Sequence, residues 1–411
     1  MFIFQDLFFF FKKNFKYKIK QYDNAIFTQF AHAYKKNNYI PSPWYNFDNL
    51  TKNKNKLWCF LYVKTNEFKD LSELKKIFSK NNSLNYMFIQ GLGSFKLIFK
   101  TLQTYTLFAI NYFLIDEKKL FEVNKIDFSD IFYKDFQKSF LGSESIKNIS
   151  NYYFIKEFQQ KYNCKNIFYL FEGQPHEKCL NYFLKNKSKL IGFAHSSIRK
   201  WHLSYFNYLK EKKNWIFEPH YICLSRDRFN FTKKMNFNSK IIDVEPIRFF
   251  DFRKKNLQTN KAKKKTVLII GDILEENTLR LIKLINKYKL KNKSKLYYFK
   301  PHIAININQS TYKGLKLINK DIDEILNKFD YFICSSSTTA GIIPFKFNKK
   351  ILFFKDSEIL NLNPINNLPR KILFSNLEEL SKKIDHYEEA KNINKYKSLS
   401  LNKWINFLEK L

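Results

Sequence analysis

The chain has 411 residues, which at about 150 residues per domain predicts two domains, each long enough to bury a core of its own. It carries 73 Lys and Arg against 37 Asp and Glu, a formal net charge of +36, while 45% of its residues are hydrophobic. That apolar share excludes a disordered polycation, and the presence of only 8 Gly and 9 Pro excludes collagen-like and low-complexity chains.

The positive charge is mostly lysine interleaved with Asn, Ile, Phe and Tyr, a mixture typical of AT-rich coding sequences. A basic surface would attract nucleic acid, anionic lipid or phosphorylated substrates. No zinc-finger, helix-turn-helix or RNP-type signature accompanies the charge, which argues against nucleic acid as a partner.

Cysteine usage and hydrophobicity indicate a cytoplasmic protein. The five cysteines are scattered and never form a Cys-x-x-Cys pair, as expected in a reducing compartment. The apolar residues 1–11 are interrupted by Gln5 and Asp6 with no cleavage site after them, so we expect no secretory signal. The hydrophobic stretch 97–115 contains Lys100 and several polar residues, which predicts a buried or surface-dipping helix rather than a membrane-spanning one.

The first half of the chain begins with a predicted strand at 57–63, followed by a helix marked by Leu71, Leu74 and Phe78. The remainder of residues 1–150 lacks clean periodicity. Beyond residue 160, Leu180, Phe183 and Leu184 predict a helix, and short continuous apolar runs predict strands that are buried on both faces. These strands are expected at 166–171, 190–194, 221–224 and 241–244.

A polar, strongly basic segment at 251–265 predicts a linker between an N-terminal unit, 1–250, and a C-terminal unit, 266–411. The second unit again alternates strands and helices, with a capping box expected from Ser375 and Glu378. Its predicted strands are 266–270, 296–299, 331–334, 351–354 and 372–374, and its helices are marked by Leu281, Ile282, Ile285 and Tyr288, by Ile322, Ile325, Leu326 and Phe329, and by Leu380 and Ile384. The predicted fold class is therefore α/β, with two Rossmann-like parallel-sheet units and a cleft between them.

Ligands of parallel sheets bind beyond the carboxyl ends of the strands, so the polar residues that follow each strand are the candidates for chemistry. Glu172 follows the strand 166–171 and could act as general base towards an acceptor hydroxyl. Glu177 could contact the substrate, although either carboxylate could instead serve the start of the next helix. His195 and Ser196 follow the strand 190–194 and could bind the acceptor, or His195 could be a structural histidine.

The second unit offers a candidate anion site. His302 and Lys300 follow the strand 296–299 and could neutralise a phosphate leaving group. A run of hydroxyls opens the next helical segment, where backbone N–H groups and side chains together can bind phosphate, while ordinary helix capping would need only one of them. The candidate donor-binding residues are Gly271, Lys300, Ser335, Ser336, Ser337, Thr338 and Thr339.

No metal site is predicted, because the seven histidines are dispersed and no His-Glu-x-x-His motif is present. Asp321 and Asp323 have the spacing of a D-x-D motif but fall at an expected helix start, where acidic residues favour the helix. The hydroxyl run also lacks the Gly-Lys-Thr of a P-loop, which argues against ATP hydrolysis.

The run YLFEGQPHEKCLNYF at 169–183, followed by LIGFAHSSI at 190–198, resembles bacterial surface-carbohydrate (O-antigen or capsule) biosynthesis proteins. Those proteins show an aromatic-Glu-Gly/Asn-x-Pro-Trp-Glu-Lys segment, in which His176 replaces the usual Trp here. The sequences KPH at 300–302 and SSSTTAG at 335–341 are similar to the His-Pro and Ser-Ser motifs of bacterial sialyl- and Kdo-type transferases, which belong to the GT-B glycosyltransferases. Ile303, where many relatives carry Pro, and Pro344, early in the following helix, depart from that pattern.

The resemblance implies a GT-B-like enzyme that moves a sugar from a nucleotide donor, CMP-linked by the motif match, to a glycan or lipid-linked acceptor. It implies catalytic roles for Glu172 as base and for His302 at the donor phosphate, with no bound metal and the nucleotide sugar as substrate. It also predicts a cytoplasmic location with peripheral association to the inner membrane. Two alternatives stay open: a polyol-phosphate transferase of teichoic-acid-like polymers, and a non-catalytic carbohydrate- or nucleic-acid-binding protein with a GT-B-like shell.

Overall fold

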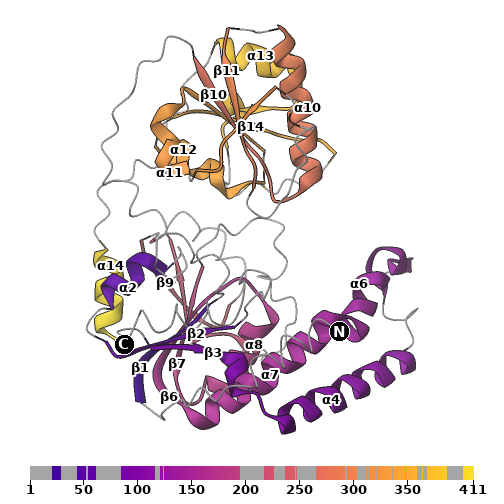
Figure 1. The fold of residues 1–411 in the computed structure, drawn as a ribbon, viewed down its shortest axis with the longest axis vertical. Helices are drawn as coiled ribbons and strands as arrows, with labels where there is room; N and C mark the ends of the chain where they lie inside the picture. Colours follow the sequence, from indigo (N-terminus) through magenta and orange to yellow (C-terminus); the bar gives the residue numbers. More distant parts are fainter. Residues whose placement is uncertain are drawn as a thin grey trace.

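The computed structural model describes two parallel sheets with their flanking helices (Figure 1). The described residues are 21–28, 44–51, 54–61, 85–115, 121–123, 125–194, 217–225, 237–245, 247, 265–291, 294–302, 312, 314–320, 322–335, 337–347, 349–358, 363, 368–386 and 401–411.

The first sheet has seven parallel strands in the order β3-β2-β1-β6-β7-β8-β9. Because the chain builds outwards from β1 on one side and then returns to its other side, the strand order reverses between β1 and β6. Such a reversal leaves a crevice at the carboxyl ends of the two strands, which is the usual ligand site of doubly wound sheets. The strands are β1 (Gln21–Thr28), β2 (Lys56–Phe60), β3 (Asn85–Phe88), β6 (Asn163–Leu170), β7 (Lys189–Phe193), β8 (Tyr221–Leu224) and β9 (Lys240–Asp243).

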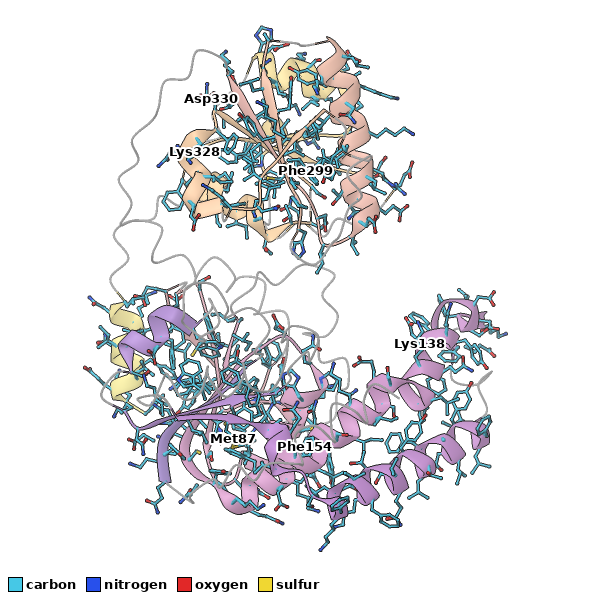
Figure 2. All side chains as sticks on the ribbon, in the orientation of Figure 1. Met87, Lys138, Phe154, Phe299, Lys328 and Asp330 are labelled. Carbon is cyan, nitrogen blue, oxygen red and sulfur yellow. The ribbon has the colours of Figure 1, made fainter. Side chains whose placement is uncertain are left out.

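Helices cover both faces of this sheet, and alternate residues of each strand supply the two cores. One face packs against α7 and α8, and α4 in turn packs on α7. Met87 and Phe154, both labelled in Figure 2, belong to the core of that layer. The helices and small strands of this part are α2 (Tyr45–Leu50), η3 (Ile89–Leu92), α4 (Phe95–Leu114), β4 (Glu122–Val123), β5 (Ile126–Asp127), α6 (Ser129–Leu141), α7 (Ser143–Lys161) and α8 (Pro175–Leu184).

The second sheet has six parallel strands in the order β12-β11-β10-β13-β14-β15, so its strand order reverses between β10 and β13. Its single core contains Phe299, which Figure 2 shows among the densely packed side chains of this unit. The strands are β10 (Thr266–Ile270), β11 (Leu296–Lys300), β12 (Lys316–Leu317), β13 (Tyr331–Ser335), β14 (Lys350–Phe354) and β15 (Leu373–Phe374). The helices are α10 (Glu275–Lys291), α11 (Ile322–Ile325), η9 (Leu326–Lys328), η10 (Thr339–Gly341), α12 (Ile342–Lys346), η11 (Arg370–Ile372) and α13 (Leu377–Asp385).

The last helix, α14 (Asn402–Glu409), belongs to the first sheet although the sequence assigned it to the C-terminal unit 266–411. Trp404 is fully buried in the core with Trp44 and Trp58, and its indole N–H donates to the Glu245 carbonyl at 2.8 Å. Figure 1 shows α14 beside α2, against the first sheet. The prediction that α14 belongs to the C-terminal unit is therefore wrong, because the apolar face of α14 completes the core of the first sheet.

All ten predicted strands are present, with bounds that differ by at most three residues from those expected. The capping box predicted from Ser375 and Glu378 is wrong: Asn376 is the N-cap of α13 and accepts from the Glu379 N–H at 2.9 Å, while the Glu379 side chain accepts from the Ser375 N–H at 2.7 Å. The helix expected around Ile322 is also shorter than predicted, because α11 passes into the 3₁₀ turn η9. The helix expected at 71–78 and nearly all of the linker 251–265 lie outside the described residues.

We expect Trp404→Ala to destabilise the first unit by about 3–5 kcal/mol, because it empties a large core site and removes a hydrogen bond. Thermal unfolding followed by circular dichroism would measure the loss. The matched control is the neighbouring Ile405→Ala, whose side chain is 40% exposed. Equal effects of the two substitutions would contradict the anchoring role of Trp404.

Candidate functional site

The carboxyl edge of the second sheet is organised by the buried carboxylate of Asp272, which follows β10 at the reversal point. Asp272 Oδ2 accepts hydrogen bonds from the hydroxyls of Ser335, at 2.6 Å, and Ser337. Its Oδ1 accepts from the Leu274 N–H at 3.1 Å. Asn277 Nδ2 also donates to the Ser337 hydroxyl, at 3.3 Å. Asp272 therefore ties the loop after β10 to the loop after β13.

This network determines what the predicted hydroxyl run can do. Ser335 and Ser337 are 1% exposed, and their hydroxyls are bonded to Asp272. Thr338 caps η10 by accepting from the Ala340 N–H at 3.3 Å, which is the single-cap alternative left open by the sequence. Thr339 is half-buried at the start of η10, while Ser336 lies outside the described residues.

Gly271 and the Lys300-Pro301-His302 segment lie side by side at the same edge. The Gly271 N–H donates to the Lys300 carbonyl at 2.9 Å, so β10 and β11 remain paired up to the last residue of β11. A Cβ at Gly271 would lie 3.2 Å from Thr278 Cγ2 and 3.3 Å from Phe299, which explains glycine there by close packing. Lys300 and His302 are half-buried beyond the sheet. The structure thus gathers Gly271, the lysine and histidine pair and the hydroxyl run at one edge.

In the first sheet, the turn from β6 into α8 holds Glu172 at the reversal point. Gly173 adopts a positive φ of 76°, which favours glycine, and Pro175 occupies the first turn of α8 as the sequence predicts. Glu172 is half-buried directly beyond β6, next to the carboxyl end of β1. This is the place that a base acting on a ligand in the crevice would occupy.

Glu177, in the first turn of α8, fixes the backbone of the turn from β6 into α8. Its side chain is 2% exposed and accepts three backbone N–H groups, from Glu172 at 2.9 Å, Gly173 at 3.1 Å and Gln174 at 3.0 Å. Burial raises the pKa of Glu177 to about 8, while the three N–H donors pull it back down. The geometry supports the helix-start role that the sequence left open, and it makes Glu177 a positioning residue for Glu172.

His176 stands beside Glu177 in the first turn of α8, at the position where the resembling proteins carry Trp. Burial, reinforced by the positive charge of Lys147 on α7, lowers the pKa of His176 to about 4. The imidazole is therefore neutral at physiological pH.

Two of the sequence-predicted substrate residues, His195 and Ser196, lie outside the described residues. In the part of the chain that the structure describes, no group of His, Cys, Asp and Glu side chains is arranged to hold a metal ion. The residue that the sequence reasoning missed is Asp272. Its signal was available, since an acid after the glycine at the end of a central strand is placed to bind the neighbouring loop.

Among solved structures, the chain is similar to a UDP-GlcNAc 2-epimerase from Neisseria meningitidis bound to UDP-GlcNAc, with a TM-score of 0.57 and 10% identity over 94% of this chain and 98% of that one. It is also similar to the UDP-GlcNAc 2-epimerase from Methanocaldococcus jannaschii, with a TM-score of 0.49 and 10% identity over 94% and 98%. A third similar structure is the glycotransferase of kitacinnamycin, with a TM-score of 0.48 and 8% identity over 89% and 90%. No protein-family model and no curated protein matches the sequence.

The two parallel sheets of seven and six strands, together with the similarity to the Neisseria meningitidis structure, confirm the expected fold class: an α/β protein of GT-B-like architecture. The structure with a TM-score of 0.57 is that of a UDP-GlcNAc 2-epimerase, and at 10% identity the similarity concerns the fold. The similarity extends over 94% of this chain, so it includes both sheets.

We expect Asp272→Ala to destabilise the second unit by about 2–5 kcal/mol, because it leaves two buried hydroxyls and a backbone N–H without their acceptor. Circular dichroism melting would measure this loss. Glu358→Ala is the control, since its side chain is 72% exposed and Arg280 keeps its ion pairs with Glu276 and Asp356, so the loss is at most about 1 kcal/mol. A melting temperature of Asp272→Ala close to that of the control would contradict the role of Asp272.

We expect part of the acid sensitivity of the protein to come from His176. Its folded pKa of about 4 lies below its ordinary value of 6.5, so the unfolded chain binds the proton more readily and stability is lost as the pH falls from about 6.5 towards 4. Melting temperatures between pH 7 and pH 5 should therefore fall less steeply in His176→Gln than in the native protein. A parallel fall in the two proteins would show that His176 does not contribute.

Proposed function

We propose that this protein is a glycosyltransferase of surface-polysaccharide synthesis, which transfers a sugar from a nucleotide donor to an acceptor hydroxyl with Glu172 as general base. The observation that carries the proposal is the placement of Glu172. It stands at the reversal point of the first sheet, on a turn whose three backbone N–H groups are fixed by the buried Glu177. A carboxylate held rigidly at the ligand crevice suits proton abstraction.

The second unit would bind the donor at its own reversal point. Lys300 and His302 lie at the carboxyl end of β11, where their positive charge or N–H groups would stabilise the phosphate that leaves. The network of Asp272 would keep the loops after β10 and β13 in a fixed shape around that phosphate, and Thr339 and Ser336 remain our candidates for hydroxyls that contact it. Preorganised groups of this kind act without being rearranged during the reaction.

The chemical step follows from these two placements. Glu172 takes the proton of the acceptor hydroxyl as the acceptor oxygen attacks the anomeric carbon of the donor sugar. The bond between that carbon and the phosphate oxygen breaks, and the nucleotide leaves with its negative charge next to Lys300 and His302. His195 and Ser196 remain our candidates for holding the acceptor.

Two donor classes deserve testing first. The similarity of residues 300–302 and 335–341 to sialyl- and Kdo-type motifs favours a CMP-linked sugar. The UDP-GlcNAc bound to the Neisseria meningitidis epimerase, which shares the fold along 94% of this chain, favours a UDP-linked one. That same similarity makes a nucleotide-sugar epimerase the second candidate function. An epimerase would act on its donor without any acceptor.

Glu172→Gln should lower acceptor-dependent nucleotide release by about 10²–10⁴-fold, because it removes a general base without changing the shape of the side chain. Binding of CMP or UDP, measured as a rise in melting temperature, should be unchanged. The assay would follow nucleotide release from CMP-sialic acid, CMP-Kdo and UDP-GlcNAc, with octyl glycosides as acceptors.

The matched control for this assay is Glu144→Gln, an exposed carboxylate on α7 that should leave the rate unchanged. Full activity of Glu172→Gln would contradict its role as base. A sugar epimerised at C2 in the absence of an acceptor would replace the transferase proposal by the epimerase. If none of the nucleotides raised the melting temperature, both proposals would fail.

A further inference from the structure

The helix α4 carries an apolar stripe on the face that points away from the rest of the protein. Phe95, Phe99 and Phe113 are 77%, 70% and 76% exposed, and Leu102 and Ile110 lie on the same side of the helix at helical spacing. Thr106 also falls on this side, but its hydroxyl donates back to the Leu102 carbonyl at 3.0 Å, which reduces its polarity. Single exposed apolar residues are ordinary, whereas a continuous stripe of this kind marks an interaction surface.

The opposite face of α4 is firmly attached to the protein. Its tyrosine and threonine hydroxyls bond to α6 and α7: Thr104 to Tyr153 at 2.7 Å, Tyr105 to the Leu141 carbonyl at 2.7 Å, and Tyr112 to Tyr133 at 2.9 Å. Figure 1 shows α4 running alongside α7 and α6, beyond the edge of the first sheet. In the described part of the chain, no helix is long and apolar enough to cross a bilayer. The stripe can therefore meet a membrane only by lying along its surface.

The charges beside the stripe indicate whether its partner is a membrane or a second copy of the chain. The sequence of α4 contains no acidic residue, and its two charged side chains are Lys96 and Lys100, which flank the stripe on one side. A two-fold pairing through this face would bring together two chains that each have a formal net charge of +36. An anionic lipid surface instead attracts the lysines, and their long side chains can reach the headgroups while the phenylalanines enter the acyl boundary.

We infer that the stripe of Phe95, Phe99, Leu102, Ile110 and Phe113 is a docking surface for an anionic lipid bilayer. The helix begins directly after β3 and η3, with Ser94 as its N-cap, so its two most exposed phenylalanines near that end lie beyond the carboxyl end of β3. Glu172 lies at the same edge of the same parallel sheet. Docking would therefore present this edge to the membrane. That the acceptor is lipid-linked follows from docking together with the proposed function, whereas the docking itself depends on neither donor nor acceptor.

The experiment is co-flotation of the purified full-length protein with vesicles of phosphatidylglycerol or of phosphatidylcholine. The native protein should bind the anionic vesicles, and more weakly as the salt concentration rises. The stripe variant replaces three phenylalanines at once: Phe95→Gln, Phe99→Gln and Phe113→Gln. Each replacement should lower the affinity for vesicles by about tenfold or more. Lys96→Gln and Lys100→Gln should each cost roughly fivefold on anionic vesicles and nothing on phosphatidylcholine.

The matched control replaces three other exposed apolar residues, Leu290→Gln, Leu317→Gln and Ile405→Gln, and should bind as the native protein does. Native melting curves of both triple variants would show that they fold. Equal vesicle binding by the native protein and the stripe variant would overturn the proposal, as would no binding by the native protein. If light scattering showed a native dimer that the stripe variant breaks, the face would be an interface between copies instead.

The two proposals can fail separately. If docking is correct and the transferase is not, vesicle binding will depend on the stripe while no nucleotide sugar is turned over. If the transferase is correct and docking is not, the stripe variant will bind vesicles as well as the native protein and remain active on octyl glycosides.

Discussion

One buried acidic side chain lies at the reversal point of each sheet, Glu177 in the first and Asp272 in the second, and the shape of the two candidate sites depends on these side chains. Glu177 gathers three backbone N–H groups of the turn after β6, and Asp272 gathers two serine hydroxyls and a backbone N–H between β10 and β13. Both side chains are almost fully removed from water. A buried acid is costly unless it is fully hydrogen-bonded, so each one holds its loop in a single arrangement.

The same two acids divide the polar residues of the strand ends into two groups. Ser335, Ser337 and Glu177 build the loops, although the sequence made each of them a candidate for ligand binding. Glu172, Lys300 and His302 are half-buried at the same edges and carry the proposed chemistry. The residues that make each loop rigid are therefore different from the residues proposed to react.

Five of the six strands of the second sheet could be predicted from sequence because each of them is a short apolar run, as in TVLII, and apolar runs are what a sheet buried on both faces requires. The edge strand β12 was not predicted, because its two residues, Lys316 and Leu317, are exposed. The central strand β1 escaped prediction because it begins Gln-Tyr-Asp-Asn, and only the fold shows that Asn24 is buried and accepts from Asn166 Nδ2 at 3.1 Å. The helix α14 was placed in the wrong unit because its apolar face shows only that it is buried, and not against which sheet.

For the candidate sites, the sequence predicted which residues lie at a strand end, but it did not predict the hydrogen bonds between them. Position beyond a strand end correctly gathered Gly271, Lys300, His302 and the hydroxyl run at one edge. It could not show that Asp272 engages two of the hydroxyls, since a hydrogen bond across 63 positions of sequence appears only once β10 and β13 are paired. The stretch 97–115 was expected to be buried or to dip into a surface, and the structure shows a helix with one face attached and the other exposed.

The central claim is that the carboxyl edge of the second sheet binds the nucleotide of a sugar donor. Hydrogen–deuterium exchange of the protein with and without CMP and UDP tests it directly. The account predicts slower exchange at 271–274, 300–302 and 337–341 with at least one of the nucleotides, and unchanged exchange in α4. Protection confined to the first sheet, or no protection with either nucleotide, would contradict it.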